Sequence, residues 1–187
     1  MLGITELKLG TNVSIDGTPY TVVWNQFSKT GRQGGVMKTK LKNLINGTVM
    51  EQSFQGSEKV EPAEIGYRRA QFLYKNGTEY AFMENDTYEQ HEFSAETLGE
   101  EKASFLVDGM DVDLMFWDGK VINIKLPPTV TLVVKETEPG VKGDTAGTAN
   151  KSAIMATGLE VKVPLFIEAG ESLVINTETG EYRERAK

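Results

Sequence analysis

The sequence predicts an all-β fold made of three small barrels. Short runs rich in β-branched and aromatic residues recur along the 187-residue chain, and Asp-Gly or Asn-Gly turns lie between several of them. Helical periodicity is confined to the stretch 95–107, where Ser94 can cap one short helix that carries an apolar stripe. Closely spaced short strands and turns of this kind are typical of small barrels.

Two proline-containing breaks divide the chain into modules. Pro62 cannot continue the hydrogen-bond ladder of a sheet, and Pro127-Pro128 makes a stiff break between two apolar runs. We therefore expect three domains, at residues 1–63, 64–128 and 129–187. Modules of this size suit an SH3-like barrel followed by two five-stranded OB-fold barrels, which commonly bind nucleic acid.

The individual strands follow from alternation and turn signals along the chain. In the first module they are expected over residues 12–15, 20–27, 35–43 and 51–54, with turns at 16–17 and 46–47. In the second they are expected over 70–75, 79–84, 89–93, 111–117 and 120–125, with turns at 76–77 and 118–119. In the third they are expected over 129–136, 152–155, 160–164 and 172–176.

The hairpin expected from residues 20–27 and 35–43 is the most informative segment. Lysines occupy every second position of its second strand, so Lys38, Lys40 and Lys42 share one face of that strand. A glycine-rich tip between the strands carries Arg32 near its apex. This pattern predicts a cation and a basic face presented to an anionic partner; a plain surface charge is the alternative interpretation of Arg32.

Positive charge is concentrated at the N-terminal end of an acidic chain. The net charge is −7, yet residues 1–63 carry seven basic and five acidic residues, whereas residues 64–128 carry six basic and 13 acidic residues. A protein that binds polyanions can use the first module as its contact surface and keep the acidic middle away from phosphates. Ordinary solubility charge on an acidic domain is the alternative.

Composition excludes several classes of protein. Because the chain has no cysteine, it cannot form disulfides, use a thiol nucleophile or bind zinc through thiolates. The first residues lack the basic region and apolar core of a signal peptide, and no apolar run approaches the ~20 residues of a membrane span. We therefore expect a cytoplasmic protein that does not associate with membranes.

Residues suited to catalysis or metal binding are sparse. His91 is the single histidine, and it has no second histidine or cysteine with which to form a metal site. Asp111 and Asp113 share a strand face, but no evident apolar pocket separates their pKa values, so a solvated face is the simpler interpretation. We expect no enzymatic activity, no catalytic residues, no bound metal and no cofactor.

Four stretches, 38–49, 138–151, 156–171 and 176–185, carry long motifs that resemble bacterial translation elongation factor P. The resemblance extends over the whole chain. It implies an elongated, tRNA-like shape built from a KOW-type SH3-like barrel and two OB-fold barrels, in a protein that acts as a monomer.

The resemblance also implies a function. Members of that family bind the ribosome between the P and E sites and stimulate peptide-bond formation at consecutive prolines. Proline reacts poorly because its ring restricts the backbone and its amine is secondary. Holding the P-site peptidyl-tRNA in a reactive geometry raises the rate, while rRNA supplies the catalytic environment. The implied protein is a non-enzymatic elongation factor whose partners are rRNA, the P-site peptidyl-tRNA and mRNA at the E site.

Two sets of residues are implied to contact RNA. The hairpin would lie along the CCA end of the P-site tRNA, with contacts from Lys29, Gly31, Arg32, Gln33, Gly34, Lys38, Lys40 and Lys42. The third module would approach the E-site codon and small-subunit RNA through Gly143, Asp144, Thr145, Ala146, Gly147, Thr148, Tyr182 and Arg185. An ordinary polar loop is the alternative for residues 143–148, and a position in the barrel core is the alternative for Tyr182.

Arg32 stands where much of the family carries a modified lysine. The family tip commonly reads Pro-Gly-Lys-Gly, and the lysine receives a β-lysyl-type extension; here the tip reads Thr30-Gly31-Arg32-Gln33, which excludes that route. A second branch carries arginine and has it rhamnosylated, so we expect rhamnosylation of Arg32 by an arginine rhamnosyltransferase. That branch often continues Asn-Ser-Ala, whereas this tip continues Gln-Gly-Gly, and residues 143–148 match the lysine branch. An unmodified Arg32 and a modified Lys29 are the alternatives.

Other functions suit the same architecture. A KOW barrel with two OB barrels also describes the paralogous elongation-factor-P-like protein and a generic RNA-binding or chaperone module. A small hydrolase that uses Asp111 and Asp113 is the enzymatic alternative. Dependence of activity on consecutive prolines separates the elongation factor from a generic RNA-binding module, and the enzymatic alternative would require turnover.

Overall fold

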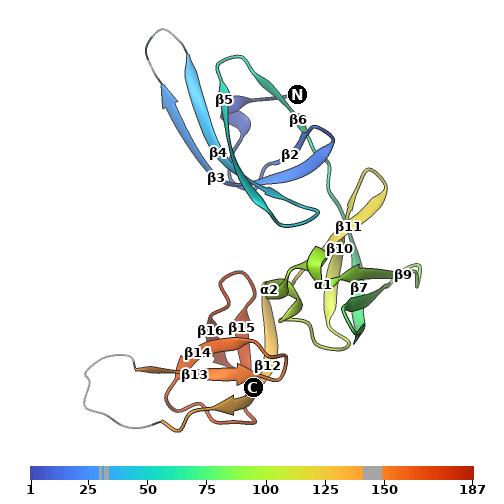
Figure 1. Ribbon diagram of the computed structural model, residues 1–187, viewed down its shortest axis with the longest axis vertical. Coiled ribbons are helices and arrows are strands. Elements are labelled where there is room, and N and C mark those ends of the chain that lie inside the picture. The colour runs from blue at the N-terminus through green and yellow to red at the C-terminus, as the bar shows by residue number, and fades with distance from the viewer. Residues whose placement is uncertain (30, 32–33, 141–148) are drawn as a thin grey trace.

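Three antiparallel sheets make up the structure, and the predicted all-β fold is confirmed. The computed structural model describes residues 1–29, 31, 34–140 and 149–187. The sheets follow one another along the chain and occupy three separate lobes (Figure 1). No helix among these residues has the length and apolar character that crossing a membrane requires.

The first sheet has the strand order β1-β6-β2-β3-β4-β5. Its elements are β1 (Leu2–Gly3), the 3-10 helix η1 (Ile4–Glu6), β2 (Asn12–Ile15), β3 (Thr18–Lys29), β4 (Gly35–Asn43), β5 (Val49–Gln55) and β6 (Lys59–Pro62). Asp16 and Gly17 have φ angles of 50° and 72°, as a two-residue turn between β2 and β3 requires. Pro62 is the last residue of β6, since it cannot donate to a continuing ladder.

Strand β4 alternates between core and solvent as its sequence predicts. Met37, Thr39 and Leu41 are buried, while the lysines between them are exposed. Met37 and Leu41 join a core made of Ile4, Leu7, Val13, Val22, Met37, Leu41, Phe54 and Val60. Burial of one face therefore fixes the register that places the lysines on the other.

The second sheet has the strand order β11-β10-β7-β8-β9. Its strands are β7 (Gly66–Asn76), β8 (Glu79–Glu84), β9 (Gln90–Ser94), β10 (Asp111–Trp117) and β11 (Lys120–Lys125). Phe72, Phe82 and Phe93 stack against one another in its core, with ring centroids 5.2 and 5.7 Å apart for the successive pairs.

The prediction of a single helix over residues 95–107 is wrong. The segment forms two short helices, α1 (Ala95–Leu98) and α2 (Glu100–Ala103), separated by Gly99. Ser94 caps α1 as expected, because its Oγ accepts a hydrogen bond of 3.1 Å from the Thr97 N–H. Gly99 ends the first helix at φ 82° and ψ 143°, which lies outside the helical region and favours glycine.

The third sheet has the strand order β14-β13-β12-β15-β16. Its strands are β12 (Thr129–Thr137), β13 (Asn150–Met155), β14 (Glu160–Pro164), β15 (Ser172–Asn176) and β16 (Tyr182–Arg185). Ile167, between β14 and β15, completes the core that inward-facing residues of these strands form: Val130, Leu132, Val134, Ala153, Met155, Val161, Val163, Leu173 and Ile175.

Adjacent residues of one segment belong to the cores of two lobes. Phe105, which follows α2, is 1% exposed and packs in the core of the third sheet. Leu106 packs in the core of the second sheet. Met110 and Leu126 pack against both cores, so a continuous apolar seam joins the second and third lobes.

A polar contact joins the first and second lobes. The Asn123 side-chain amide donates to the Ile45 carbonyl at 3.1 Å, and its oxygen accepts from Lys102 Nζ at 3.1 Å. Lys102 also donates to the Ile124 carbonyl at 2.8 Å. Burial, with a smaller effect from the positive charge of Lys42, lowers the pKa of Lys102 from 10.5 to about 8.

The lowered pKa of Lys102 should make the free energy of unfolding depend on pH. Because its folded-state pKa lies near 8 and its unfolded-state pKa near 10.5, the unfolded chain binds more protons between these values. The free energy of unfolding should therefore gain on the order of 2 kcal/mol from this group as pH rises across that window. Denaturant unfolding at several pH values measures the gain, which Lys102→Met should remove and Lys120→Met should keep. Equal pH slopes in wild type and Lys102→Met would contradict this assignment.

Candidate nucleic-acid interface

The predicted hairpin consists of β3 and β4, and it extends beyond the core of the first lobe. Val22 and Leu41 pack in that core, but residues 23–29 of β3 are exposed or only partly buried. The two strands pair from Tyr20 opposite Asn43 to Lys29 opposite Gly35. They run side by side to one end of the lobe (Figure 1). The distal part of the hairpin is thus a surface for contact rather than packing.

Glycines shape the approach of β4 to the hairpin tip. Gly34 has a φ of +82°, a conformation that other residues rarely adopt. A Cβ on Gly35 would lie 2.4 Å from the ring of Phe27, so the phenyl ring lies directly over this glycine. Larger residues at these two positions would displace Phe27 or strain the backbone.

The structure describes three of the five residues predicted to form the contact at the tip. Lys29, Gly31 and Gly34 are exposed at the ends of the two strands. Arg32 and Gln33 lie outside the described residues. The sequence-based assignment of Arg32 to the apex therefore remains a prediction.

The three predicted lysines differ in their surroundings. Lys38 pairs across the sheet with Gln26 and Ser53, and Lys40 pairs with Trp24 and Glu51. Lys40 Nζ lies 3.4 Å from a Glu51 carboxylate oxygen, and both side chains are largely exposed, so this ion pair contributes little stability.

Lys42, at the other end of β4, lies on the side that faces the second lobe. Its charge contributes to the lowered pKa of Lys102 in the contact between the two lobes. The three lysines therefore form a basic line that runs along β4 from the hairpin toward the second lobe, with exposed side chains at positions 38, 40 and 42.

Trp24 is an exposed aromatic residue that the sequence analysis missed. It is 42% exposed and stands beside Lys40, whose Nζ lies 6.0 Å from the centre of the indole ring. The sequence offered one signal: Trp24 lies between Asp16 and Glu51, a stretch that contains the lysines of β4 and no acidic residue. A tryptophan in a strand usually indicates a core position, which concealed this role.

Of the third-lobe residues predicted to contact RNA, the structure describes only Tyr182 and Arg185. Residues 143–148, predicted to approach mRNA, lie outside the described part of the chain, between β12 and β13. Tyr182 is partly buried and packs against the core of the third sheet. Arg185 donates to Glu171 at 3.0 Å and lies 5.1 Å from the Phe166 ring centre.

The environment of Glu171 shows how Arg185 is engaged. The backbone N–H of Glu168 and then the Arg185 guanidinium lower the pKa of Glu171. Glu171 keeps its negative charge and holds the guanidinium of Arg185 in place. Contact of Arg185 with RNA would therefore have to share the guanidinium with this carboxylate.

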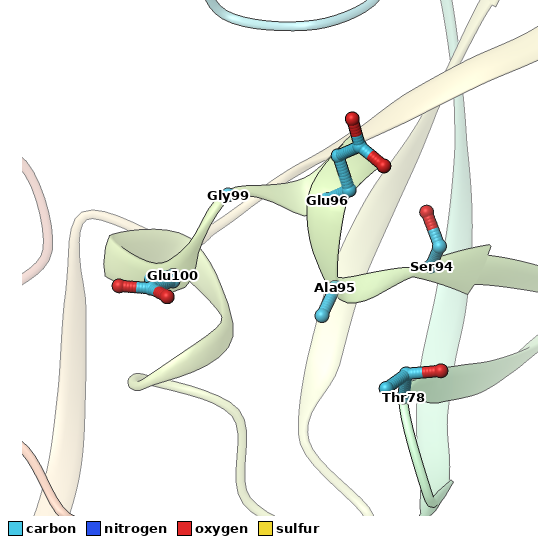
Figure 2. Close-up of a pocket in the computed structure, with 6 residues that line it drawn as sticks. All are labelled: Thr78, Ser94, Ala95, Glu96, Gly99 and Glu100. Carbon is cyan, nitrogen blue, oxygen red and sulfur yellow. The ribbon is translucent and has the colours of Figure 1, made fainter.

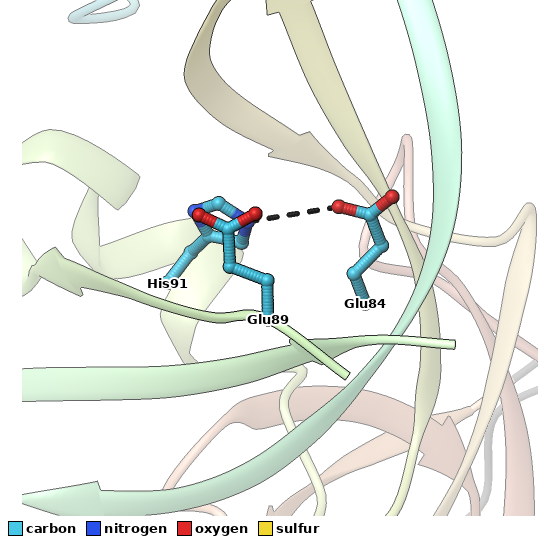
Figure 3. Close-up of side chains that lie close together, drawn as sticks. All are labelled: Glu84, Glu89 and His91. Carbon is cyan, nitrogen blue, oxygen red and sulfur yellow. Dashed lines mark ion pairs between the residues drawn. The ribbon is translucent and has the colours of Figure 1, made fainter. Parts of the chain in front are cut away.

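The surroundings of His91 include two carboxylates. Figure 3 shows His91, Glu84 and Glu89 with their polar atoms turned toward one another. One atom from each lies within 4.8 Å of the others, a set of donors that can in principle hold a cation. His91 Nε2 is 3.8 Å from Glu84, and Arg68 lies 3.3 Å from the other Glu84 oxygen. Because Arg68 already compensates the buried Glu84 carboxylate, we regard this group as a structural charge cluster.

A hollow of about 580 Å³ lies beside α1 and the start of α2. It is lined by Thr78, Ser94, Ala95, Glu96, Gly99 and Glu100. Figure 2 shows the carboxylates of Glu96 and Glu100 pointing in different directions, so they do not converge on a common ligand. Its acidic character also opposes binding of phosphate groups.

Three family descriptions match consecutive parts of the chain. Residues 4–60 match the elongation factor P KOW-like domain, residues 65–124 match the elongation factor P OB domain, and residues 130–185 match the elongation factor P C-terminal domain. The predicted architecture of a KOW-like barrel followed by two OB-fold barrels is confirmed.

One relative is similar over its entire length. "Elongation factor P 2" of Geobacter sulfurreducens (strain ATCC 51573 / DSM 12127 / PCA) is 41% identical over 187 residues, which cover 100% of both chains.

Solved structures of translation factors also resemble part of the chain. Eukaryotic translation initiation factor 5A from Methanococcus jannaschii has 27% identity and a TM-score of 0.49, covering 66% of this chain and 94% of that one. A translation initiation factor eif-5a family protein from Naegleria fowleri ATCC 30863 has 17% identity and a TM-score of 0.49, with coverages of 67% and 96%.

Proposed function

The chain belongs to the elongation factor P family, and we propose that its β3–β4 hairpin performs the family's task through Arg32. It is a non-enzymatic translation factor that relieves stalling of ribosomes at consecutive prolines. Its partners are the ribosome and tRNA. Cytoplasmic ribosomes are its proposed place of action, where it binds as a monomer between the P and E sites.

The basic line of lysines on β4 is the observation that supports RNA binding by the hairpin. Lys38, Lys40 and Lys42 point to solvent because the residues between them are buried in the core. Lys38 and Lys42 are four residues apart, about 14 Å along the strand, so the line can follow an RNA strand across neighbouring phosphates. Backbone contacts of this kind position a protein on RNA without reading its sequence.

Arg32 and its neighbours form the proposed contact with the CCA end of the P-site tRNA. Lys29, Gly31 and Gly34 are exposed beside Arg32 and Gln33 in the chain, and small residues permit close approach of the backbone to RNA. Holding the peptidyl-tRNA in a reactive geometry lowers the entropic cost of peptide-bond formation. This cost matters most at proline, whose ring restricts the backbone and whose amine is secondary.

Rhamnosylation of Arg32 by an arginine rhamnosyltransferase is the proposed modification. It would lengthen the side chain and add hydroxyl groups that can hydrogen-bond to RNA. Arginine also supplies a planar guanidinium that lysine lacks.

The third lobe is proposed to contact mRNA at the E site and small-subunit RNA. Residues 143–148 connect β12 to β13 and are rich in glycine, alanine and threonine, which suits close backbone approach. Tyr182 and Arg185 supply the accompanying contacts from β16. We also propose residues 1–63, 64–128 and 129–187 as the three domains, since each range contains one complete sheet.

Dependence of translation on consecutive prolines tests the function. A reconstituted system without this protein should stall on a message that encodes Pro-Pro-Pro, and adding the protein should restore full-length product. A message with alanines in place of the prolines is the matched control and should be translated equally in both cases. Equal synthesis of the proline message with and without the protein would overturn the proposal.

A further inference from the structure

A groove of about 450 Å³ lies on the outer face of β3, β4 and β5. Figure 1 shows these strands in the first lobe. The strand register arranges its polar and aromatic side chains in two cross-strand rows. One row holds Trp24, Lys40 and Glu51, and the other holds Gln26, Lys38 and Ser53. The groove therefore combines one large aromatic ring, two ammonium groups, an amide, a hydroxyl and a carboxylate.

A β-bulge turns Trp24 into this groove. Val22 pairs with Leu41 and Trp24 pairs with Lys40, so Val23 is an extra residue in β3. In a strand without a bulge at Val23, regular alternation would place Trp24 on the buried face with Val22. Bulges commonly redirect a side chain in this way. The backbone of β3 is thus shaped to expose an indole ring that would otherwise enter the core.

Lys40 lies over the indole ring of Trp24, and this residue remains 42% exposed. Lys40 Nζ is 6.0 Å from the ring centre and is held by Glu51 at 3.4 Å. Gln26 is the next residue of β3 on the same face, and Lys38 lies opposite Gln26 on β4. A flat ligand can therefore lie on the indole while the ammonium groups meet charge at its edge.

We propose that this groove binds one unpaired nucleobase of ribosomal or transfer RNA, stacked on Trp24. The inference rests on the proposed function, because it places this face of the hairpin against RNA. Aromatic side chains next to basic residues are the usual platform for unpaired bases, and stacking tolerates every base. Lys38 and Lys40 neutralise the flanking phosphates.

The polar groups indicate a preference among bases. The Glu51 carboxylate can accept from an exocyclic amino group, and the Gln26 amide can both donate and accept at a base edge. A base with an amino group, such as cytosine or adenine, should therefore bind better than uracil, whose edge has no amino donor. Glu51 also disfavours a second phosphate in the groove.

The first experiment measures how much protein is needed for rescue. Full-length wild type and Trp24→Leu are titrated into the reconstituted Pro-Pro-Pro system described above. Because stacking contributes about 1–3 kcal/mol per base, Trp24→Leu should require at least about fivefold more protein for half-maximal rescue. Trp24→Phe keeps an aromatic face and should stay within a few-fold of wild type.

A matched control comes from the second lobe. Tyr67 is 47% exposed, and Lys125 Nζ lies 5.2 Å from its ring centre, so it reproduces an exposed aromatic beside a lysine. Tyr67→Leu should leave the half-maximal concentration unchanged. Thermal unfolding of each variant checks that the fold is retained.

The second experiment tests the ligand. In a Trp117→Phe background, Trp24 is the one remaining tryptophan, and its fluorescence is followed on addition of short oligocytidylate, oligouridylate or cytidine monophosphate. We expect quenching by oligocytidylate at lower concentration than by oligouridylate. Saturation by the monophosphate at the same concentration as by the oligonucleotide would instead indicate a free-nucleotide site and overturn the proposal.

The outcomes separate this inference from the proposed function. If wild type rescues the proline message and Trp24→Leu rescues it equally at every protein concentration, the nucleobase site is wrong and the elongation-factor role stands. If wild type itself fails to rescue, the proposed function fails. A raised half-maximal concentration in Trp24→Leu, with Trp24→Phe and Tyr67→Leu near wild type, supports the site.

Discussion

Protein with Arg32 replaced by alanine is expected to lose stimulation of Pro-Pro synthesis while its fold remains intact. We propose that Arg32 contacts the P-site tRNA, so its replacement by alanine removes the cation required for that contact. The free energy of unfolding should change by no more than about 0.5 kcal/mol, because the neighbouring Lys29, Gly31 and Gly34 are exposed. Rescue of the proline message and denaturant unfolding measure the two effects.

A matched control removes a positive charge elsewhere in the same lobe. Lys59 is exposed on β6, away from the lysine line of β4. Lys59→Ala should rescue the proline message as wild type does. Retention of full rescue by Arg32→Ala would contradict the assignment of the tip.

Arg32→Lys distinguishes a requirement for charge from a requirement for a sugar. Lysine keeps the cation but lacks the planar guanidinium and its nitrogens as glycosylation acceptors. The variant should fail almost as completely as Arg32→Ala if rhamnose is needed. Protein purified from its native host should then carry the mass of one deoxyhexose on Arg32. An unmodified native protein together with an active lysine variant would refute the rhamnose proposal and leave the ribosomal role unaffected.

Local pattern predicted those parts of the fold that local forces determine. The alternation of β4 and the Asp16-Gly17 turn follow from residue types alone, and both occur as predicted. Strands β1, β6 and β16 were missed, since each has only two to four residues. Strands β1 and β6 are defined by pairing with distant segments, whereas β16 pairs with the neighbouring β15 and has mostly exposed residues. The predicted start of β7 at residue 70 was late, because its first residues are mostly polar or exposed and pair with β10.

In the candidate site, too, the features set by local residue pattern could be predicted and those set by contacts between strands could not. The exposed lysines follow from period-two alternation, which the sequence shows directly. The outward turn of Trp24 depends on a bulge, and the engagement of Arg185 depends on Glu171, fourteen residues away in the chain. Neither a register shift nor a partner from another strand is visible in residue order. Glycine at position 99 was visible, but its effect on the expected helix was underestimated.

Phe105→Ala is expected to be the most destabilising single change proposed for this chain. The phenyl ring is 1% exposed and fills a place in the core of the third sheet, although it follows α2 of the second lobe. Truncation removes its apolar contacts and leaves a cavity, at a cost of about 3–5 kcal/mol. Phe105→Leu refills part of the space and should cost less, whereas Phe166→Ala, at a residue 59% exposed, should cost little. Denaturant unfolding of the three variants measures the order.

The position of Phe105 between two cores gives this change a functional consequence. Leu106 stays in the second core when Phe105 is truncated, so the seam between the second and third lobes is weakened from one side. Because we propose that the first lobe contacts the P-site tRNA and the third lobe contacts mRNA, we expect function to need both lobes held at a set separation. Phe105→Ala should therefore reduce rescue of the proline message even at temperatures where each lobe stays folded, and Phe105→Leu should restore most of it. Unchanged unfolding in Phe105→Ala would show that the ring does not join the third core. Full rescue by a destabilised Phe105→Ala would show instead that the two lobes work without a rigid seam.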